Sequence, residues 1–257
     1  MSLKEQNETI NEKVRMAFSL SEDVASHEEI RTRLLDGGKI TGTNMCVMVC
    51  AMIIASVGLN VSSTAVIIGA MLISPIMGSI LASAYGNVSA DYMLLRNHML
   101  GLGMQVAISV AAASIYFFLS PVKEPTVELL ARTSPTFFDV LIAFFGGLAG
   151  IIGQTRIDKT NTVIPGVAIA TALMPPLCTC GYSIANMQWD MLLGAGYLFI
   201  INAYFIFLAA SIILTVLRIP KTNELTDREW KMHRFRMVRN TIIIALPSIV
   251  ALYWMVH

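Results

Sequence analysis

Seven apolar stretches, separated by short polar connections, make up most of the sequence after residue 43. Most of them approach the roughly 20 residues that a helix needs to cross about 30 Å of hydrocarbon. None alternates apolar and polar residues as a barrel strand would. The pattern predicts an all-α, polytopic helical membrane protein with about seven transmembrane helices. The expected spans are 44–60, 64–86, 98–120, 137–155, 163–186, 189–217 and 241–256.

Two polar segments flank these spans. Residues 1–43 are expected to be a cytosolic N-terminal segment with a short amphipathic helix near 26–36, where Ser26 and Glu29 resemble a capping box. Residues 221–240 fit a basic amphipathic helix on the cytoplasmic surface, although an ordinary polar loop explains them equally well. The side chains expected to bind anionic lipid there are Arg228, Lys231, Arg234, Arg236 and Arg239.

Composition and charge distribution support a membrane protein. Hydrophobic residues make up 55% of the 257 residues, charged residues 14%, and the mean hydropathy is +0.66. These values exclude a disordered chain, a disulfide-rich module and a coiled coil, and they disfavour an ordinary soluble enzyme. With seven spans, 16 of the 18 Lys and Arg residues fall on one side, which is typical of the cytoplasmic face. We expect a multi-pass protein of the cytoplasmic (inner) membrane with its N-terminus inside and its C-terminus outside.

The spans before 221 suggest an internal repeat of two three-span units, 44–121 and 137–220. An odd number of crossings makes the second unit enter from the opposite side, so the repeat would be inverted, with the span at 241–257 outside it. The shared composition of apolar helices is the alternative explanation. Three landmarks recur 99–101 residues apart, namely Pro75 with Pro176, Asp91 with Asp190, and Pro121 with Pro220.

Prolines interrupt the second and the fifth predicted spans. A proline inside a helix lacks the amide donor and leaves the carbonyl four residues earlier without its partner. In hydrocarbon such an unpaired group costs several kcal/mol, so a hydroxyl, water or ligand must satisfy it. Kinked helices held by Ser and Thr side chains, with an interhelical amide, are the structural alternative. The predicted substrate-binding residues are Ser74, Pro75, Thr171, Pro175, Pro176 and Asn202.

The chemistry of the expected site is bounded by what the spans contain. No Lys, Arg or Glu lies inside any predicted span, which disfavours a proton-coupled pump. No Asp pair, Ser–Lys pair or His cluster lies at membrane depth, so an enzyme is not expected. The four cysteines do not suggest a metal site, and neither a cofactor nor a nucleic-acid partner is expected.

A channel or facilitator-like transporter, active as a homo-oligomer, is the function that these features favour. Its solute would be small and polar or an ion, bound at the midplane between the repeats. The alternative is a non-transporting scaffold or sensor that recruits lipid or a cytosolic partner through its basic segments.

Three stretches of the sequence resemble a known family. Residues 58–80, 165–181 and 199–204 are similar to the prokaryotic hydrophobic membrane domain catalogued as domain of unknown function 389. The resemblance covers about residues 44–218 and implies an integral membrane protein without specifying an activity. Ser79, Cys178 and Cys180 depart from the usual residues. The matching residues are Ile68–Gly69–Ala70–Met71, Ser74–Pro75, Pro165–Gly166–Val167–Ala168, Pro175–Pro176 and Asn202.

Overall fold

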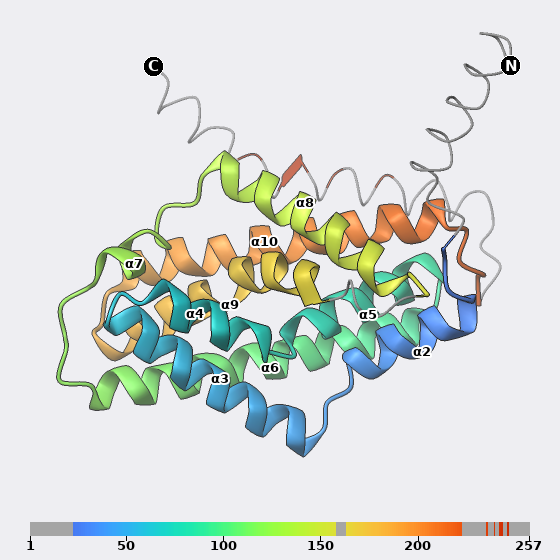
Figure 1. Cartoon of the computed structure of the whole chain (residues 1–257). Helices are drawn as coiled ribbons and strands as arrows, with labels where there is room; N and C mark the ends of the chain where they lie inside the picture. Colours follow the sequence, from blue (N-terminus) through green and yellow to red (C-terminus); the bar gives the residue numbers. More distant parts are fainter. Residues whose placement is uncertain are drawn as a thin grey trace, which may run out of the picture.

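The described part of the chain is an elongated bundle of helices. The computed structural model describes residues 23–157 and 163–222 and the single positions 235, 239, 242, 243 and 246. The long helices lie side by side, with α2 at one end and α7 at the other (Figure 1). The helices are α2 (His27–Gly37), α3 (Gly42–Asn60), α4 (Thr64–Leu72), α5 (Ile76–Val88), α6 (Tyr92–Leu119), α7 (Val127–Leu130), α8 (Phe137–Gln154), α9 (Val163–Ala185) and α10 (Trp189–Val216).

Four described helices, α3, α6, α8 and α10, are long and apolar enough to cross a membrane. The bent pair α4–α5 makes a fifth if it counts as one span. Large apolar side chains such as Phe118, Phe138 and Leu193 are more than half exposed, as expected where lipid replaces water. The all-helical, multi-pass prediction is therefore confirmed, but the total of seven spans is not. The predicted span 241–256 and most of the basic segment lie outside the described residues.

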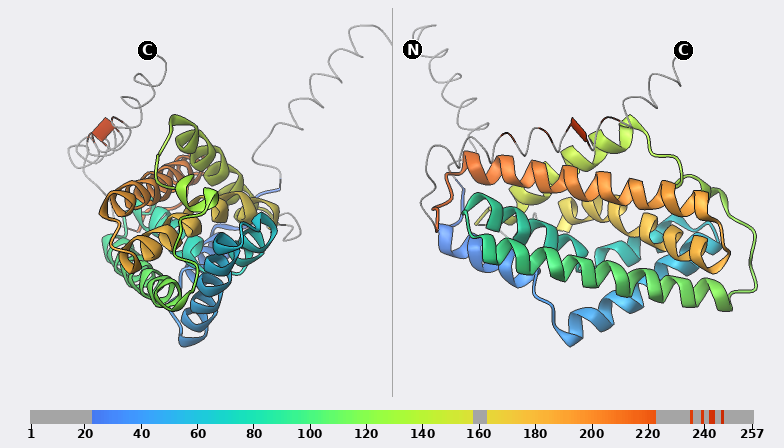
Figure 2. Two further views of the ribbon diagram at one scale, coloured as in Figure 1. Left: turned by 90° about the vertical axis from the view of Figure 1, so that its left-hand side faces the viewer. Right: turned by 180° about the vertical axis from the view of Figure 1, so that it is seen from behind.

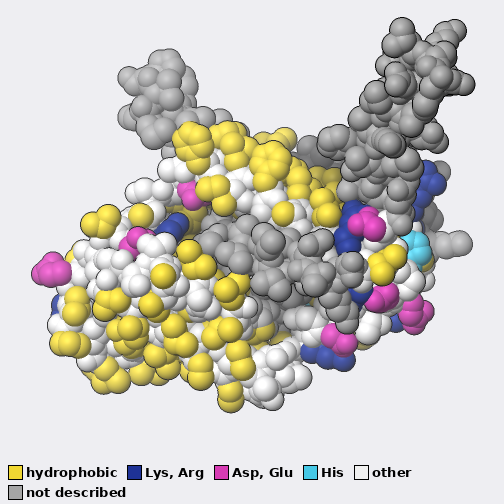
Figure 3. All heavy atoms as spheres, viewed as in Figure 1, with side chains coloured by type: hydrophobic (Ala, Val, Ile, Leu, Met, Phe, Trp, Pro, Cys, Tyr) yellow, Lys and Arg dark blue, Asp and Glu magenta, His cyan; other side chains and the backbone are white. Residues whose placement is uncertain are grey.

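Charged and apolar surfaces are separated along the bundle. Yellow apolar side chains cover much of the face in Figure 3, whereas most charged ones gather near α2 at one end and a few lie at the opposite end. We refer to these two ends as the α2 end and the α7 end. The separation along the long axis is the arrangement that a bilayer imposes on a spanning protein.

Helix α6 begins six residues before the predicted span at 98, because a polar residue caps it. The carboxylate of Asp91 accepts a hydrogen bond of 3.0 Å from the amide of Leu94. An aspartate in this position satisfies one of the free amides of the first turn and fixes the start of the helix.

The predicted break in the second span is confirmed. Helices α4 and α5 meet at a bend of 48°. Before the bend, the amides of Ile73 and Ser74 bond to carbonyls three residues back, on Ala70 and Met71. The helix thus tightens into its last turn and stops, and Pro75 begins the next one.

The predicted break in the fifth span was wrong, because α9 is one continuous helix with Pro175 and Pro176 inside it. Both prolines are buried. Helix α9 packs against α3, α4, α5, α6, α8 and α10, and the end-on view in Figure 2 places it near the centre of the bundle. Packing on all sides holds a helix together in spite of a local preference to break.

Helix α2 closes one end of the bundle. The side chains of Ile30 and Leu34 are buried beneath it. Its last residue, Gly37, meets Gly78 of α5 so closely that a Cβ atom at Gly78 would overlap the Gly37 carbonyl group. Only glycine permits this approach of two backbones.

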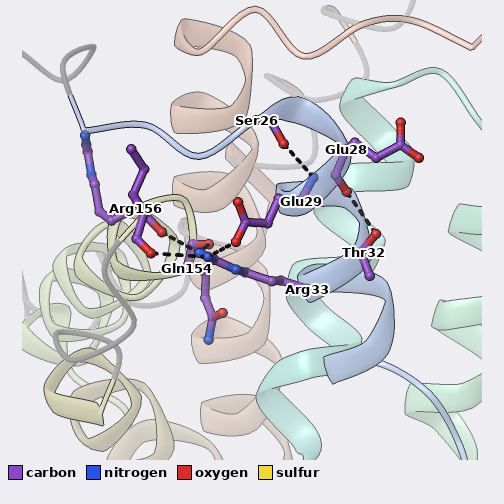
Figure 4. A network of polar contacts seen from close by, with 8 residues as sticks. Ser26, Glu28, Glu29, Thr32, Arg33, Gln154 and Arg156 are labelled. Carbon is purple, nitrogen blue, oxygen red and sulfur yellow. Dashed lines mark hydrogen bonds and ion pairs between the residues drawn. The ribbon is translucent and has the colours of Figure 1, made fainter.

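Polar contacts also tie α2 to the end of α8 (Figure 4). Arg33 pairs with Glu29 and donates hydrogen bonds to the carbonyls of Gln154 and Arg156. A cation at the carboxyl end of a helix satisfies carbonyls that have no partner inside the helix. The segment before α2 continues this link, since Arg156 pairs with Asp23.

Two tight turns join consecutive long helices in the same way. Ala90, between α5 and α6, has φ of 57°, and Met187, between α9 and α10, has φ of 56°. In each turn an amide reaches back five residues, from Asp91 to the Gly86 carbonyl (2.9 Å) and from Gln188 to the Ser183 carbonyl (2.8 Å). Helices α6 and α10 both have 28 residues.

Candidate functional site

The interior of the bundle contains uncharged polar side chains. In the described ranges the one buried charged residue is Arg156, which lies at the α2 end. Polar groups inside a membrane protein are costly and normally serve packing or function. Those that are buried within the long helices are Ser56, Ser79, Ser83, Gln105, Ser109, Thr179, Ser183, Asn202 and Ser211.

Two predicted site residues, Ser74 and Pro75, line a cavity at the break between α4 and α5. The cavity has a volume of about 190 Å³ and lies beneath α2, whose Arg33 forms part of its wall. Gln154 at the end of α8 lines it as well. The Ser74 hydroxyl has no hydrogen-bond partner among the described residues. The cavity thus joins a basic end of the bundle to the interrupted helix.

The other predicted residues do not line this cavity. Pro175, Pro176 and Asn202 are buried, and the side chain of Thr171 lies outside the described residues. Their helices are nevertheless adjacent, since α9 packs against α4, α5 and α10. The structure therefore brings the elements of the predicted site together, but not all six side chains into one cavity.

Hydroxyl groups near the predicted site bond to their own helices. Ser83 donates to the Ser79 carbonyl at 2.7 Å in α5, and Thr179 donates to the Pro175 carbonyl at 3.0 Å in α9. Ser183 likewise donates to Thr179 at 2.7 Å. This is the back-bonding of the structural alternative, and it removes these hydroxyl protons from any ligand.

The sequence analysis missed Gln105 on α6. Its side chain is fully buried, and neither its amide nitrogen nor its amide oxygen has a hydrogen-bond partner in the described part of the chain. Ser109, one turn later on the same face, is also fully buried, and its hydroxyl has no described partner. Unpaired polar groups of this kind are rare in native interiors and point to a ligand, water or strain.

The depth of Gln105 follows from how α6 packs on α9. The rings of Phe117 and Tyr182, near the ends of these helices, contact edge to face with centroids 5.2 Å apart. A Cβ atom at Gly181 would lie 2.8 Å from the amide of Ser114, so α9 also touches α6 about one turn before Phe117. Since α6 and α9 run in the same direction, Gln105, nine residues before Ser114, lies roughly 13 Å inside this contact, about one turn deeper than Pro175.

A second hollow is an outer groove of about 440 Å³ between α5, α6 and α10. Its wall is almost entirely apolar, with Met99, Phe199 and Phe207 among the lining residues. An apolar groove on the outer face of a membrane bundle suits a lipid chain better than a polar solute.

The remaining candidates are the predicted lipid-binding residues and any cluster of metal-binding side chains. Of the predicted lipid-binding residues, Arg239 is described as an exposed helical residue, and Arg228, Lys231, Arg234 and Arg236 lie outside the described residues. No cluster of three or more His, Cys, Asp or Glu side chains is present within the described ranges.

Comparison with known proteins gives a family. The sequence model of the family described as "Domain of unknown function (DUF389)" matches residues 71–208. The chain is also 26% identical over 188 residues to the uncharacterized protein MJ0678 of Methanocaldococcus jannaschii. The match covers 73% of this chain and 58% of that relative, so the chain spans less than two thirds of the relative's length. No solved structure matches the chain.

Proposed function

The chain belongs to the domain of unknown function family DUF389, and on this premise we propose that it is a channel or facilitator-like transporter for a small polar solute or ion. The observation that carries the proposal is the interrupted helix at Ser74–Pro75, which faces a cavity from the α2 end. Broken helices with unpaired polar groups are where membrane transporters bind their solutes.

The helix bounds support a repeat of two three-helix units. Helices α6 and α10 begin 97 residues apart and end 97 residues apart, and the turn residues Ala90 and Met187 have the same separation. This register differs from the spacing of 99–101 residues given by the sequence landmarks. It pairs Ser74 with Thr171, so the two predicted hydroxyl residues occupy the same position in each unit.

The directions of the helices support an inverted arrangement. Helices α6 and α9 run in the same direction, as their contacts at the α7 end require. Because a tight turn reverses the chain between α9 and α10, α10 runs opposite to α6. The packing is consistent with this exchange, since α6 packs on α9 of the other unit and α10 packs on α5. The proposed pathway lies between these units, with the α2 end in the cytoplasm, where most Lys and Arg residues fall.

Flux through reconstituted vesicles tests the proposal. The full chain would be placed in liposomes, and the influx of urea, glycerol, K⁺ and Cl⁻ compared with influx into empty vesicles. We expect each of two variants to slow the flux about tenfold, the effect of one lost hydrogen bond to the solute. Pro75→Ala restores a backbone amide donor at the break, which would compete with the solute for a backbone carbonyl. Asn202→Ala removes the side-chain amide. Gly103→Ala is the matched control, because a Cβ atom there contacts nothing within 4 Å.

Two results would contradict the proposal. Wild-type vesicles that pass no solute faster than empty ones would favour the scaffold or sensor alternative. Unchanged flux in both variants, with melting temperatures equal to that of the wild type, would remove the break and Asn202 from the pathway.

A further inference from the structure

We infer that Gln105 and Ser109 form a ligand-binding face inside the bundle, and that its ligand is a small neutral solute that both donates and accepts hydrogen bonds. The inference rests on the proposed function and names the class of solute. It starts from two fully buried side chains on one face of α6 whose polar atoms have no partner among the described residues.

The amide group of Gln105 defines the chemistry of the ligand. A glutamine side chain carries two N–H donors and one carbonyl acceptor. A bound cation would pair with the oxygen and leave the nitrogen unpaired, whereas an anion would do the reverse. A neutral solute with hydroxyl or amide groups accepts from the nitrogen and donates to the oxygen. Ser109 adds a hydroxyl that serves in either direction.

The surroundings also disfavour an ion at this depth. Moving an ion out of water requires an opposite charge or several oriented dipoles to replace its hydration. No buried Asp, Glu or Lys is present in the described spans, and the buried Arg156 lies at the α2 end. A neutral solute has no such requirement, since matched hydrogen bonds replace those it made with water.

The position of Gln105 fits the two-unit arrangement. Gln105 and Asn202 are 97 residues apart and lie at the middle of α6 and of α10. Each proposed unit therefore contributes one buried carboxamide at its centre. A solute that passes between the two units would meet the hydrogen-bond donors and acceptors of both amides near the middle of the bundle.

Selectivity and substitution together test this inference. Urea and glycerol are the neutral probes, and K⁺ and Cl⁻ the ionic ones, in vesicles containing the full chain. Gln105→Met keeps the length of the side chain but removes the donors and the acceptor, and Ser109→Ala removes the hydroxyl. We expect wild-type vesicles to admit urea or glycerol without ions, and Gln105→Met to slow that entry about tenfold. Ser211→Ala is the matched control, because this hydroxyl is also buried without a described partner but lies near the end of α10.

The outcomes separate this inference from the proposed function. Ion flux without neutral flux, lost in Asn202→Ala, would overturn the choice of solute and leave the proposed function standing. Unchanged neutral flux in Gln105→Met, together with a higher melting temperature, would overturn the binding role and make the amide a structural cost. Absence of any flux in the wild type would overturn both.

Discussion

Replacing Gly78 with alanine tests whether the backbones of α2 and α5 touch as closely as described. The added Cβ atom would overlap the carbonyl group of Gly37 and lie 3.0 Å from the amide of Gly38. Neither contact involves a flexible side chain that could move aside. Because a carbon and a carbonyl oxygen normally stay at least about 3.3 Å apart, α2 must retreat by about 1.5 Å.

The energetic cost follows from what α2 buries. Ile30 and Leu34 are 0% and 2% exposed, and each contributes about 1.5–3 kcal/mol by burial. A retreat of α2 also lengthens the hydrogen bonds from Arg33 to the end of α8. Overpacking of this kind costs about 1–3 kcal/mol, so we expect α2 to loosen by about 2 kcal/mol. That corresponds to roughly thirtyfold more frequent local opening.

Hydrogen exchange of the α2 amides in detergent or nanodiscs measures this opening directly. Protection of His27–Gly37 should fall roughly thirtyfold in Gly78→Ala while the amides of α6 and α10 keep theirs. Gly103→Ala is the control, because it adds the same atom where nothing lies within 4 Å. Unchanged protection of α2, or an equal loss throughout the bundle, would refute the reasoning.

Three further substitutions test other contacts by thermal or denaturant unfolding in detergent. Asp91→Ala removes the cap of α6 and should lower the free energy of unfolding by about 1 kcal/mol; stability equal to the wild type would show that the cap contributes nothing. Tyr182→Phe keeps the ring but loses the hydrogen bond to the Lys123 carbonyl, and we expect a loss of about 1 kcal/mol. Gly147→Val should cost about 3 kcal/mol, because even a Cβ atom there would lie 2.8 Å from the Cα of Ile206; an unchanged melting temperature would contradict this close crossing of α8 and α10.

Hydropathy alone located the described spans well, because length and apolar content are what a bilayer demands. The spans predicted at 137–155 and 189–217 end within one residue of α8 and α10. The start of α6 was missed because its second turn, which contains Arg96 and His98, is polar and made the span appear to begin later, although Asp91 caps the helix. Capping depends on one side chain and one amide, which a hydropathy average does not detect.

Proline predicted one break correctly and one wrongly, and the difference lies in packing. At Pro75 the chain has already tightened into its last turn, so a bend of 48° relieves the clash of the ring. At Pro175 and Pro176 six neighbouring helices surround α9 and hold it continuous. The sequence contains the local preference at both sites, but the neighbours that override it become known only from the fold.

The candidate site was predictable in its elements rather than in its side chains. Ser74 and Asn202 stood out because a polar residue next to a proline or inside a long apolar span is conspicuous. Gln105 has no proline near it in the sequence, so the proline pattern did not point to it. The signal that would have found it is its position 97 residues before Asn202, once the two units are aligned by their helix ends.

The two tight turns at Ala90 and Met187 determine which helices move together as rigid units. In each turn an amide donates a hydrogen bond to the carbonyl five residues earlier and so fixes the two helices to each other. Helices α5 and α6 therefore move as one rigid unit, and α9 and α10 as another. The described residues 73–75 make no hydrogen bond of this kind. Any alternation between open and closed shapes would therefore pivot at the bend before α5, at the end of the α5–α6 pair that lies opposite its tight turn.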